Sequence, residues 1–317
     1  MKHISIPGLD KQVSELVMGT IYFRPSNIDF TCDMLDAYVA AGGNTLDTAH
    51  IYCGGESEQA IGLWLEKRGR SDDVVILTKG AHHDKDGPRV TPACIASDLK
   101  DSLERLKVDT IDMYALHRDD PNTPVSVIIE ALNEHIAAGR IRTIGGSNWT
   151  HERLQEANEY AAAHGLVGFT FNSPNLSLAK PNEPRWPGCV SADDAMIEWH
   201  ERTQMPLLSW SSQAGGFFSG RFAPDKLDDP ETVRVYYSEA NWKRYDRAVA
   251  LAEQKGVSAI QIACAYVLHQ SFPACALIGP QTIDEMHSSM EAIRIKLTPE
   301  EVAWLDLKSE TTPLALR

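Results

Sequence analysis

The stretch that decides the fold is residues 46–65, LDTAHIYCGGESEQAIGLWL. Its apolar start ends in an acid, Asp47, and a tyrosine, Tyr52, follows five residues later, before a Gly-Gly turn and a helical run. This order is typical of a buried strand that passes through a tight loop into a helix. The stretch therefore predicts a β-to-α unit with a carboxylate and a phenol together at the mouth of its strand.

The same unit recurs along the chain, because short apolar runs alternate with amphipathic helical patterns and no linker separates them. Runs such as VVILT, residues 74–78, suit parallel strands that are buried on both faces. Eight such units predict the α/β class and a single-domain (β/α)8 TIM barrel over residues 1–317. A doubly wound open sheet is the alternative, but no G-x-G-x-x-G follows an early strand. The strand candidates are residues 15–19, 44–47, 74–79, 111–117, 142–146, 167–171, 206–210 and 274–279.

Helix-boundary signals agree with this pattern. Residues 28–43 repeat apolar side chains at helical spacing and stop at two glycines, which indicates a C-terminal cap. Three other helices are predicted to begin at a Thr-Pro pair, with threonine as N-cap and proline as the first helical residue. These pairs are Thr91-Pro92, Thr123-Pro124 and Thr298-Pro299, the last with Glu301 as a capping box. Residues 173–191 and 221–239 are predicted to be irregular, and loops of this length are usually functional.

Composition excludes several classes of function. The chain has 30 Lys and Arg against 44 Asp and Glu, a formal net charge of -14. An acidic chain without a basic stripe is a poor candidate for binding nucleic acid or an anionic membrane surface. No run approaches the ~18 apolar residues of a membrane span, and the start of the chain does not resemble a signal peptide. Six scattered cysteines without Cys-x-x-Cys spacing favour reduced thiols in a cytoplasmic protein.

Polar side chains stand at the predicted strand ends, where a barrel carries its chemistry. Asp47, Lys79 and His117 end three consecutive strands, and Ser147 and Asn148 end the next one. Because neighbouring strand ends meet at one face of the barrel, we expect the first three to converge, with Tyr52 in reach from its loop.

This set of side chains predicts proton transfer to a carbonyl oxygen. A phenol has a pKa of about 10 in water, which makes it a weak acid at neutral pH. An adjacent Lys79 ammonium is expected to lower the pKa of Tyr52, and Asp47 is expected to keep Lys79 protonated. His117 would orient the carbonyl by a hydrogen bond, so that an oxyanion is protonated as it forms. Any one of these residues alone would more often be structural; four in this order favour a catalytic site.

With these residues the sequence resembles the aldo-keto reductase family. The resemblance runs from near the start of the chain to near its end, in a fixed order. The matching motifs are MGT (18–20), DTAHIYCGGESEQAIG (47–62), LTKG (77–80), LHRDDP (116–121), GGSN (145–148), LLSWSSQAGGFFSGRF (207–222) and LIGPQTIDEMHSSMEAI (277–293).

The resemblance implies a barrel that binds a nicotinamide dinucleotide without a Rossmann domain and transfers a hydride to an aldehyde or ketone. It assigns Tyr52 as proton donor, Lys79 and Asp47 as its modulators and His117 as the residue that positions the carbonyl. Trp210 stands where the family has an aromatic residue on the nicotinamide, and Ser173 aligns where many members have glutamine. The implied cofactor positions are Gly19, Thr20, Asp47, Ser147, Asn148, Ser173, Trp210, Ser211, Ser212, Gln213, Gly215, Arg221, Gly279, Gln281, Glu285 and Ser289.

The choice of cofactor stays open at this point. The family resemblance implies NADP(H). However, the segment that would surround the 2′-phosphate carries Asp284 and Glu285, and a carboxylate repels a phosphate but accepts hydrogen bonds from a free ribose hydroxyl. NAD(H) is therefore the alternative.

The substrate side of the site is predicted from aromatic residues in the loops. Tyr22, Phe23 and Trp149 are expected to contact the substrate, and Trp186 lies in a loop on the same face. With the nearby polar groups of Arg118, Asp119 and Asn175, these aromatic residues favour a polar, sugar-like carbonyl compound. The pair His82-His83 is expected at the rim, without a metal, because adjacent histidines on an extended chain point apart. The rival interpretation is a regulatory or redox-sensing subunit that binds nucleotide with little turnover, since a fold alone does not fix function.

Overall fold

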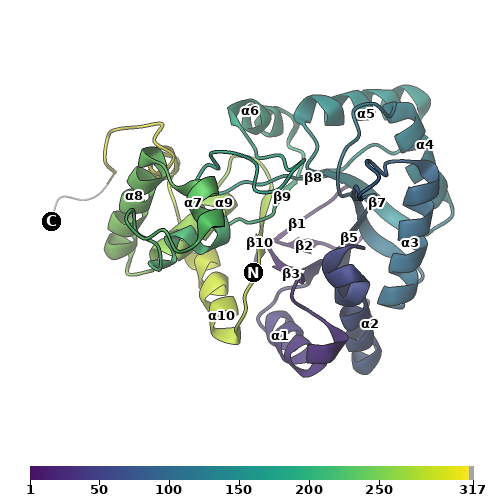
Figure 1. Cartoon of the computed structure of the whole chain (residues 1–317), viewed down its shortest axis with the longest axis horizontal. Coiled ribbons are helices and arrows are strands. Elements are labelled where there is room, and N and C mark those ends of the chain that lie inside the picture. Colours follow the sequence, from purple (N-terminus) through teal and green to yellow (C-terminus); the bar gives the residue numbers. More distant parts are fainter. Residues whose placement is uncertain (314–317) are drawn as a thin grey trace.

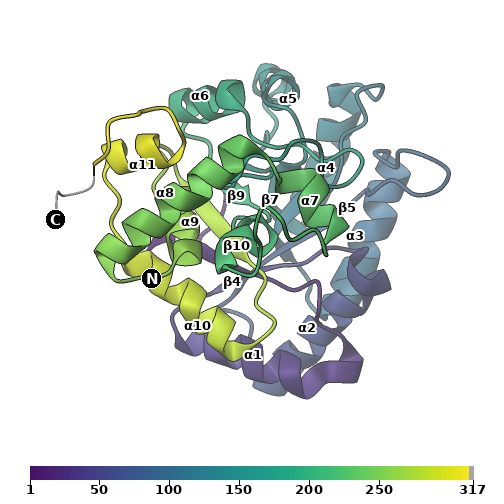
Figure 2. The ribbon, with the colours of Figure 1, turned by 60° about the vertical axis from the view of Figure 1, so that its left-hand side comes forward.

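Eight parallel strands close into a barrel that helices surround (Figures 1 and 2), in a computed structural model that describes residues 1–313. The strand order around the barrel is β10-β3-β4-β5-β6-β7-β8-β9. Closure confirms the predicted (β/α)8 barrel and excludes the open sheet. The strands are β3 (Leu16–Gly19), β4 (Thr45–Asp47), β5 (Val75–Gly80), β6 (Ile111–Leu116), β7 (Ile141–Ser147), β8 (Phe171–Ser173), β9 (Leu207–Ser209) and β10 (Ala274–Ile278).

The N-terminal end of the barrel is closed by a hairpin that the sequence analysis did not predict. It consists of the antiparallel strands β1 (His3–Ile4) and β2 (Val13–Ser14). Ile6 and Val13 of this segment are buried in the same apolar cluster as the side chains inside the barrel. The carboxyl ends of the strands are therefore the open mouth of the barrel, where the polar strand ends lie.

The helices pack outside the strands, and Figure 1 shows α2, α3 and α4 on one side with α8, α9 and α10 on the other. None of the helices within residues 1–313 has the length and apolar content to cross a membrane. The helices are α1 (Ile28–Ala40), α2 (Glu56–Arg68), α3 (Pro92–Leu106), α4 (Val125–Ala137), α5 (His151–His164), α6 (Asp194–Thr203), α7 (Pro230–Tyr236), α8 (Glu239–Lys255), α9 (Ala259–Leu268), α10 (Ile283–Glu291) and α11 (Pro299–Leu305). Short 3-10 turns are η1 (Pro25–Asn27), η2 (Tyr52–Gly55), η3 (Ala214–Ser219) and η4 (Ala292–Arg294).

Two of the three predicted Thr-Pro caps are confirmed and one is wrong. Thr91 accepts a hydrogen bond from the backbone of α3, and Thr298 forms the predicted capping box with Glu301. In contrast, α4 starts one residue later than expected, with Pro124 in the N-cap position. Thr123 does not cap α4, because its hydroxyl donates to Asp120 Oδ2 at 2.8 Å.

One predicted strand is misplaced. The expected strand 167–171 overlaps β8 only at Phe171, and β8 continues into the polar residues that follow. Before β8, Asn133 from α4 bonds both the N–H and the C=O of Val167, and Asn158 from α5 does the same for Phe169. These side chains satisfy backbone groups that a strand neighbour would otherwise pair.

The two stretches that were predicted to be irregular pack on each other at the mouth of the barrel. The stretch 221–239 in fact contains the helix α7. Arg185, from the stretch 173–191, donates to Glu231 of α7 at 2.7 Å, and Asn182 N donates to Val235 O at 2.7 Å. The contact holds both segments over the carboxyl ends of the strands.

Candidate active site

Three of the predicted catalytic side chains meet at the ammonium of Lys79. Its Nζ lies 2.7 Å from Asp47 Oδ1, 2.8 Å from Thr48 O and 3.2 Å from Tyr52 OH. An ammonium has three N–H donors, so these three acceptors satisfy it. His117 completes the group, with its ring centroid 5.7 Å from that of Tyr52. The four side chains from separate elements therefore form one cluster.

The rest of the opening stretch explains why Tyr52 reaches this cluster. Tyr52 starts the turn η2, and Cys53, with a φ of 52°, begins a left-handed run that turns the chain into α2. Ser57 at the start of α2 donates to Thr20 O at 2.8 Å, after β3. The buried Glu58 accepts from Thr78, the neighbour of Lys79, at 2.6 Å. These bonds fix the start of α2, and hence Tyr52, relative to β3 and β5.

Lys79 lowers the pKa of Tyr52, as expected, but the net pKa of Tyr52 is still above its ordinary value. Burial raises the pKa of Tyr52, and the nearby Lys79 charge offsets only part of that effect. Burial also raises the pKa of Asp47 despite the adjacent ammonium. For Lys79, burial lowers the pKa, but Asp47 and Tyr52 together outweigh it and the pKa is raised. The phenol is therefore firmly protonated at neutral pH, beside a charged ammonium.

His117 is held in its neutral form. Burial lowers its pKa well below the ordinary value, and the charges of Lys79 and Arg118 add to the effect. A neutral imidazole carries one N–H donor and can orient a carbonyl oxygen without adding a charge to the site.

A cavity of about 900 Å³ opens above this cluster, near the upper end of the ~300–1,000 Å³ found for small-molecule sites. It contains every predicted catalytic residue and all predicted cofactor positions except one. The predicted residues that line it are Gly19, Thr20, Tyr22, Asp47, Tyr52, Lys79, His117, Ser147, Asn148, Trp210, Ser211, Ser212, Gln213, Gly215, Arg221, Gly279, Gln281, Glu285 and Ser289.

Three predicted site residues lie outside the lining. Ser173 is fully buried behind Ser147, which donates to its carbonyl at 3.1 Å, so its contact with the cavity is indirect. Trp149 is fully buried against Phe169, and Phe23 packs against Phe30 in the core. Phe23 and Trp149 are thus core residues and not substrate contacts, because each ring turns inward from its loop.

Comparison with known proteins agrees with this geometry. The sequence pattern of the aldo/keto reductase family matches residues 15–310. The chain belongs to the aldo/keto reductase family. It is accordingly an NAD(P)-dependent oxidoreductase.

Individual relatives of this aldo-keto reductase are distant but cover almost all of it. It is 28% identical to a norsolorinic acid reductase of Emericella nidulans, over 92% of this chain and 77% of the relative. It is 27% identical to a putative aryl-alcohol dehydrogenase of Saccharomyces cerevisiae, over 93% of this chain and 83% of the relative. A crystal structure of a thermostable aldo-keto reductase with the inhibitor epalrestat has the same fold, with a TM-score of 0.76 at 22% identity, over 98% of this chain and 100% of that one.

The residues at the inner end of the reductase's cavity fit a nicotinamide. Asn148 has a φ of 59°, and its Oδ1 accepts from the indole Nε1 of Trp210 at 3.1 Å. This bond fixes the Trp210 ring beside the strand ends, where it offers an aromatic face. Ser147 and Asn148 supply hydroxyl and amide groups next to it, which match the hydrogen-bonding capacity of a carboxamide.

The outer end of the cavity fits the phosphates and ribose of a dinucleotide. Gly215 and Gly216 both have positive φ, at 61° and 83°, and a Cβ at Gly216 would lie 2.9 Å from Arg221 Nη2. The Arg221 guanidinium donates to Gly215 O at 2.6 Å and lines the cavity. These glycines keep backbone and guanidinium together, as a pyrophosphate site requires.

At the far end, Glu285 lines the cavity and its Oε2 accepts from Gln281 N at 2.7 Å. The segment 279–289 contains no lysine or arginine. Asp284, in contrast to Glu285, is not part of the lining. Of the two acids in this segment, Glu285 therefore contributes the carboxylate that lines the cavity.

Two of the other lining residues, Arg118 and Trp186, were expected on this face from the sequence, whereas Cys189 and Arg185 were not. Arg118 and Cys189 meet in the wall next to His117, and Arg185 and Trp186 come from the stretch 173–191. For Cys189 and Arg185 the length of that stretch was the signal, since its residues reach the cavity through the contact with α7. His82 and His83 line the cavity, as expected for a rim, and no cluster of three metal-ligating side chains occurs within residues 1–313.

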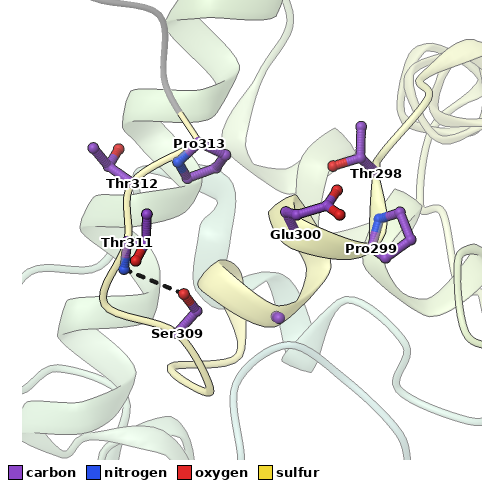
Figure 3. Close-up of a pocket in the computed structure, with 8 residues that line it drawn as sticks. Thr298, Pro299, Glu300, Ser309, Thr311, Thr312 and Pro313 are labelled. Carbon is purple, nitrogen blue, oxygen red and sulfur yellow. Dashed lines mark hydrogen bonds between the residues drawn. The ribbon is translucent and has the colours of Figure 1, made fainter.

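A second hollow lies beside α11 and shares no residue with the cavity (Figure 3). It is lined by threonine, proline and serine residues, one alanine, Ala303, and a single carboxylate, Glu300. This lining has no tyrosine, lysine or histidine, unlike the group of Asp47, Tyr52, Lys79 and His117.

Proposed function

We propose that this reductase converts an aldehyde or ketone to the alcohol with Tyr52 as the proton donor. The observation that carries the proposal is the 3.2 Å hydrogen bond from Lys79 Nζ to Tyr52 OH at the base of the cavity. It pairs a protonated phenol with the charge that stabilises its conjugate base. Residues 1–317 act as one catalytic unit in this proposal.

The roles of the side chains follow from their protonation states. When bound, the reduced nicotinamide supplies the hydride. Tyr52 donates its proton to the carbonyl oxygen, and the Lys79 ammonium stabilises the phenolate that remains. Asp47 holds the ammonium in place, and neutral His117 donates a hydrogen bond that orients the carbonyl.

The cofactor end supports acceptance of NADH beside NADPH. Glu285 is a hydrogen-bond acceptor suited to a ribose hydroxyl, and it repels a 2′-phosphate. The family typically uses NADPH. Titration of the enzyme with each cofactor at equal concentrations, followed by tryptophan fluorescence, tests this, because stacking on Trp210 quenches its emission.

The substrate is proposed to be a polar carbonyl compound, sugar-like or aromatic. Tyr22 and Trp186, 45% and 43% exposed, line the cavity and offer aromatic faces beside hydrogen-bonding groups. The names of the relatives, a norsolorinic acid reductase and an aryl-alcohol dehydrogenase, add aromatic carbonyls to the candidates. A substrate panel in which only apolar aliphatic aldehydes react would rule out the polar class.

The decisive experiment for Tyr52 is the variant Tyr52→Phe. It should bind cofactor as the parent does but lose about 10²- to 10⁴-fold in kcat, the usual contribution of a general acid. If Tyr52→Phe reduced carbonyls at the parental rate, the assignment would be wrong. If neither protein turned over any carbonyl while both bound nucleotide, the regulatory-subunit interpretation would replace this one.

A further inference from the structure

Arg118 is a buried cation in the cavity wall that has no charged partner among residues 1–313. It follows His117 at the end of β6, and it is 8% exposed. Its Nη1 donates to His117 O at 2.8 Å and its Nη2 to Cys189 Sγ at 3.4 Å. Burial raises the pKa of the Cys189 thiol, so this acceptor is neutral as well. A buried charge without an opposite charge is costly, which makes the missing partner significant.

The acids that follow Arg118 in the sequence are turned away from it. Asp119 forms an ion pair with Arg153 at 3.1 Å. Asp120 accepts from Thr123 at 2.8 Å. Sequence proximity therefore does not provide the counter-charge.

The carboxylates that line the cavity are also engaged elsewhere. Asp47 pairs with Lys79, Asp229 caps α7 through Thr232 N at 3.0 Å, and Glu285 accepts from Gln281 N at 2.7 Å. Arg185 is paired too, with Glu231. Two arginines in the lining thus lack an acidic partner. Arg221 lies at the outer end of the cavity, next to Gly215, and Arg118 lies at the inner end, next to His117.

The surroundings of Arg118 hold it in place and keep the local charge positive. Gly188, with a φ of 73°, lies so close that a Cβ there would be 3.4 Å from Arg118 Cδ. Burial lowers the pKa of the neighbouring imidazoles of His82 and His117, and the charge of Arg118 contributes to both shifts. These rings are therefore neutral and offer hydrogen-bonding groups without a negative charge.

We infer that Arg118 binds an anionic group of the substrate, a carboxylate or a phosphate, while the carbonyl lies at Tyr52 and His117. The guanidinium is the side chain best suited to such groups, and a bound anion would supply the charge that the protein does not. This inference rests on the proposed function and narrows its substrate to an anionic aldehyde or ketone.

The test compares ring-matched aldehydes: 4-formylbenzoate, 4-formylphenyl phosphate and the uncharged methyl 4-formylbenzoate. The parent enzyme should have a higher kcat/KM for one or both anionic aldehydes than for the ester. Comparison of the carboxylate with the phosphate then shows which anionic group Arg118 prefers. In Arg118→Met the anion-over-ester ratio should fall about 10- to 100-fold, mainly through KM, as expected for loss of a hydrogen bond to a charged group. Arg118→Lys should recover part of the ratio. The control Arg202→Met, at an exposed arginine on α6, should leave it unchanged.

A binding arm keeps the test independent of turnover. Benzoate and benzamide are titrated into the enzyme with oxidised cofactor, again by tryptophan fluorescence, and benzoate should bind tighter in the parent and lose this advantage in Arg118→Met. Equal binding of the two compounds by the parent, or an unchanged anion-over-ester ratio in Arg118→Met, would overturn the inference. Selective benzoate binding without reduction of any aldehyde would support Arg118 as the anion site and count against the proposed function instead.

Discussion

The substitution Lys79→Met tests the arrangement on which the site depends. It removes the donor that serves Asp47 Oδ1, Thr48 O and Tyr52 OH, at 2.7, 2.8 and 3.2 Å. Asp47 is only 3% exposed, so its carboxyl group would be left in a buried place without a charged partner. We therefore expect a large loss of stability together with a loss of turnover.

The size of the stability loss can be bounded from these contacts. Three buried acceptors without donors cost about 1–3 kcal/mol each, which sums to roughly 3–9 kcal/mol. The upper part of this range is not reached, because Asp47 can take up a proton, and removal of one partner of a buried ion pair usually costs about 3–5 kcal/mol. Adding Asp47→Asn removes the stranded charge, so the double variant should recover about 2 kcal/mol or more.

The pH dependence follows from the same carboxyl group. Burial already raises the pKa of Asp47 in the parent, and without Lys79 it rises further. A folded-state pKa above the unfolded value favours the folded state at low pH and disfavours it as pH rises through the folded pKa. The difference in the free energy of unfolding between the parent and Lys79→Met should therefore be larger at pH 8 than at pH 5.

Urea unfolding followed by tryptophan fluorescence at pH 5 and pH 8 measures these differences. The matched control is Lys243→Met, which breaks an exposed ion pair with Glu310 and should cost less than about 1 kcal/mol. The reasoning fails if Lys79→Met also costs less than about 1 kcal/mol at pH 8, or if its cost is the same at both pH values.

Three other predictions concern separate parts of the molecule. Because the pKa of Tyr52 is raised, the rate of carbonyl reduction should stay constant from pH 7 to 9, while the rate of alcohol oxidation, which needs the phenolate, should rise with pH. Initial rates in both directions check this, and a steep fall in the rate of reduction above pH 7 would contradict it. Glu285→Arg should lower KM for NADPH relative to NADH by about tenfold, since it replaces repulsion of the 2′-phosphate with a charge-assisted hydrogen bond; equal ratios in the parent and variant would exclude Glu285 as the determinant. Thr298→Ala should cost about 1 kcal/mol in urea unfolding without changing kcat, because it removes the cap of α11; an unchanged unfolding midpoint would show that the cap is dispensable.

The barrel was predictable because each unit encodes its own ends. The apolar strand runs and the glycine and Thr-Pro boundaries are local signals, and most of them place the elements correctly. The error at β8 has a different origin, since Asn133 and Asn158 bind the backbone before it from helices that are distant in sequence. The closing hairpin was missed because its strands have only two residues each, too short for a periodic pattern.

The site was predictable to the extent that strand ends determine it. Asp47, Lys79 and His117 follow directly from the barrel, because adjacent strands bring their ends together. Side-chain direction within a loop does not follow from sequence, which is why Trp149 was assigned to the substrate although its ring is buried in the core. The pairing of Arg118 with Cys189 depends on how the stretch 173–191 folds back, and no local pattern encodes that contact.

The raised pKa of Tyr52 also bears on the role proposed for Lys79. If Lys79 served only to make the phenol more acidic, the pKa of Tyr52 would be below its ordinary value in the resting enzyme. It is raised instead, because burial outweighs the effect of Lys79. In the proposed mechanism the ammonium therefore acts mainly after proton transfer, when a phenolate would stand 3.2 Å away in a poorly hydrated place, because stabilisation that appears only then lowers the barrier. The same argument implies that the cluster is costly for the fold at rest, since it buries an acid, an ammonium and an imidazole whose charged forms prefer water. Replacing Asp47 and Lys79 together by leucine and methionine should accordingly leave a protein at least as stable as the parent and without reductase activity, which is the trade between stability and function expected at an active site.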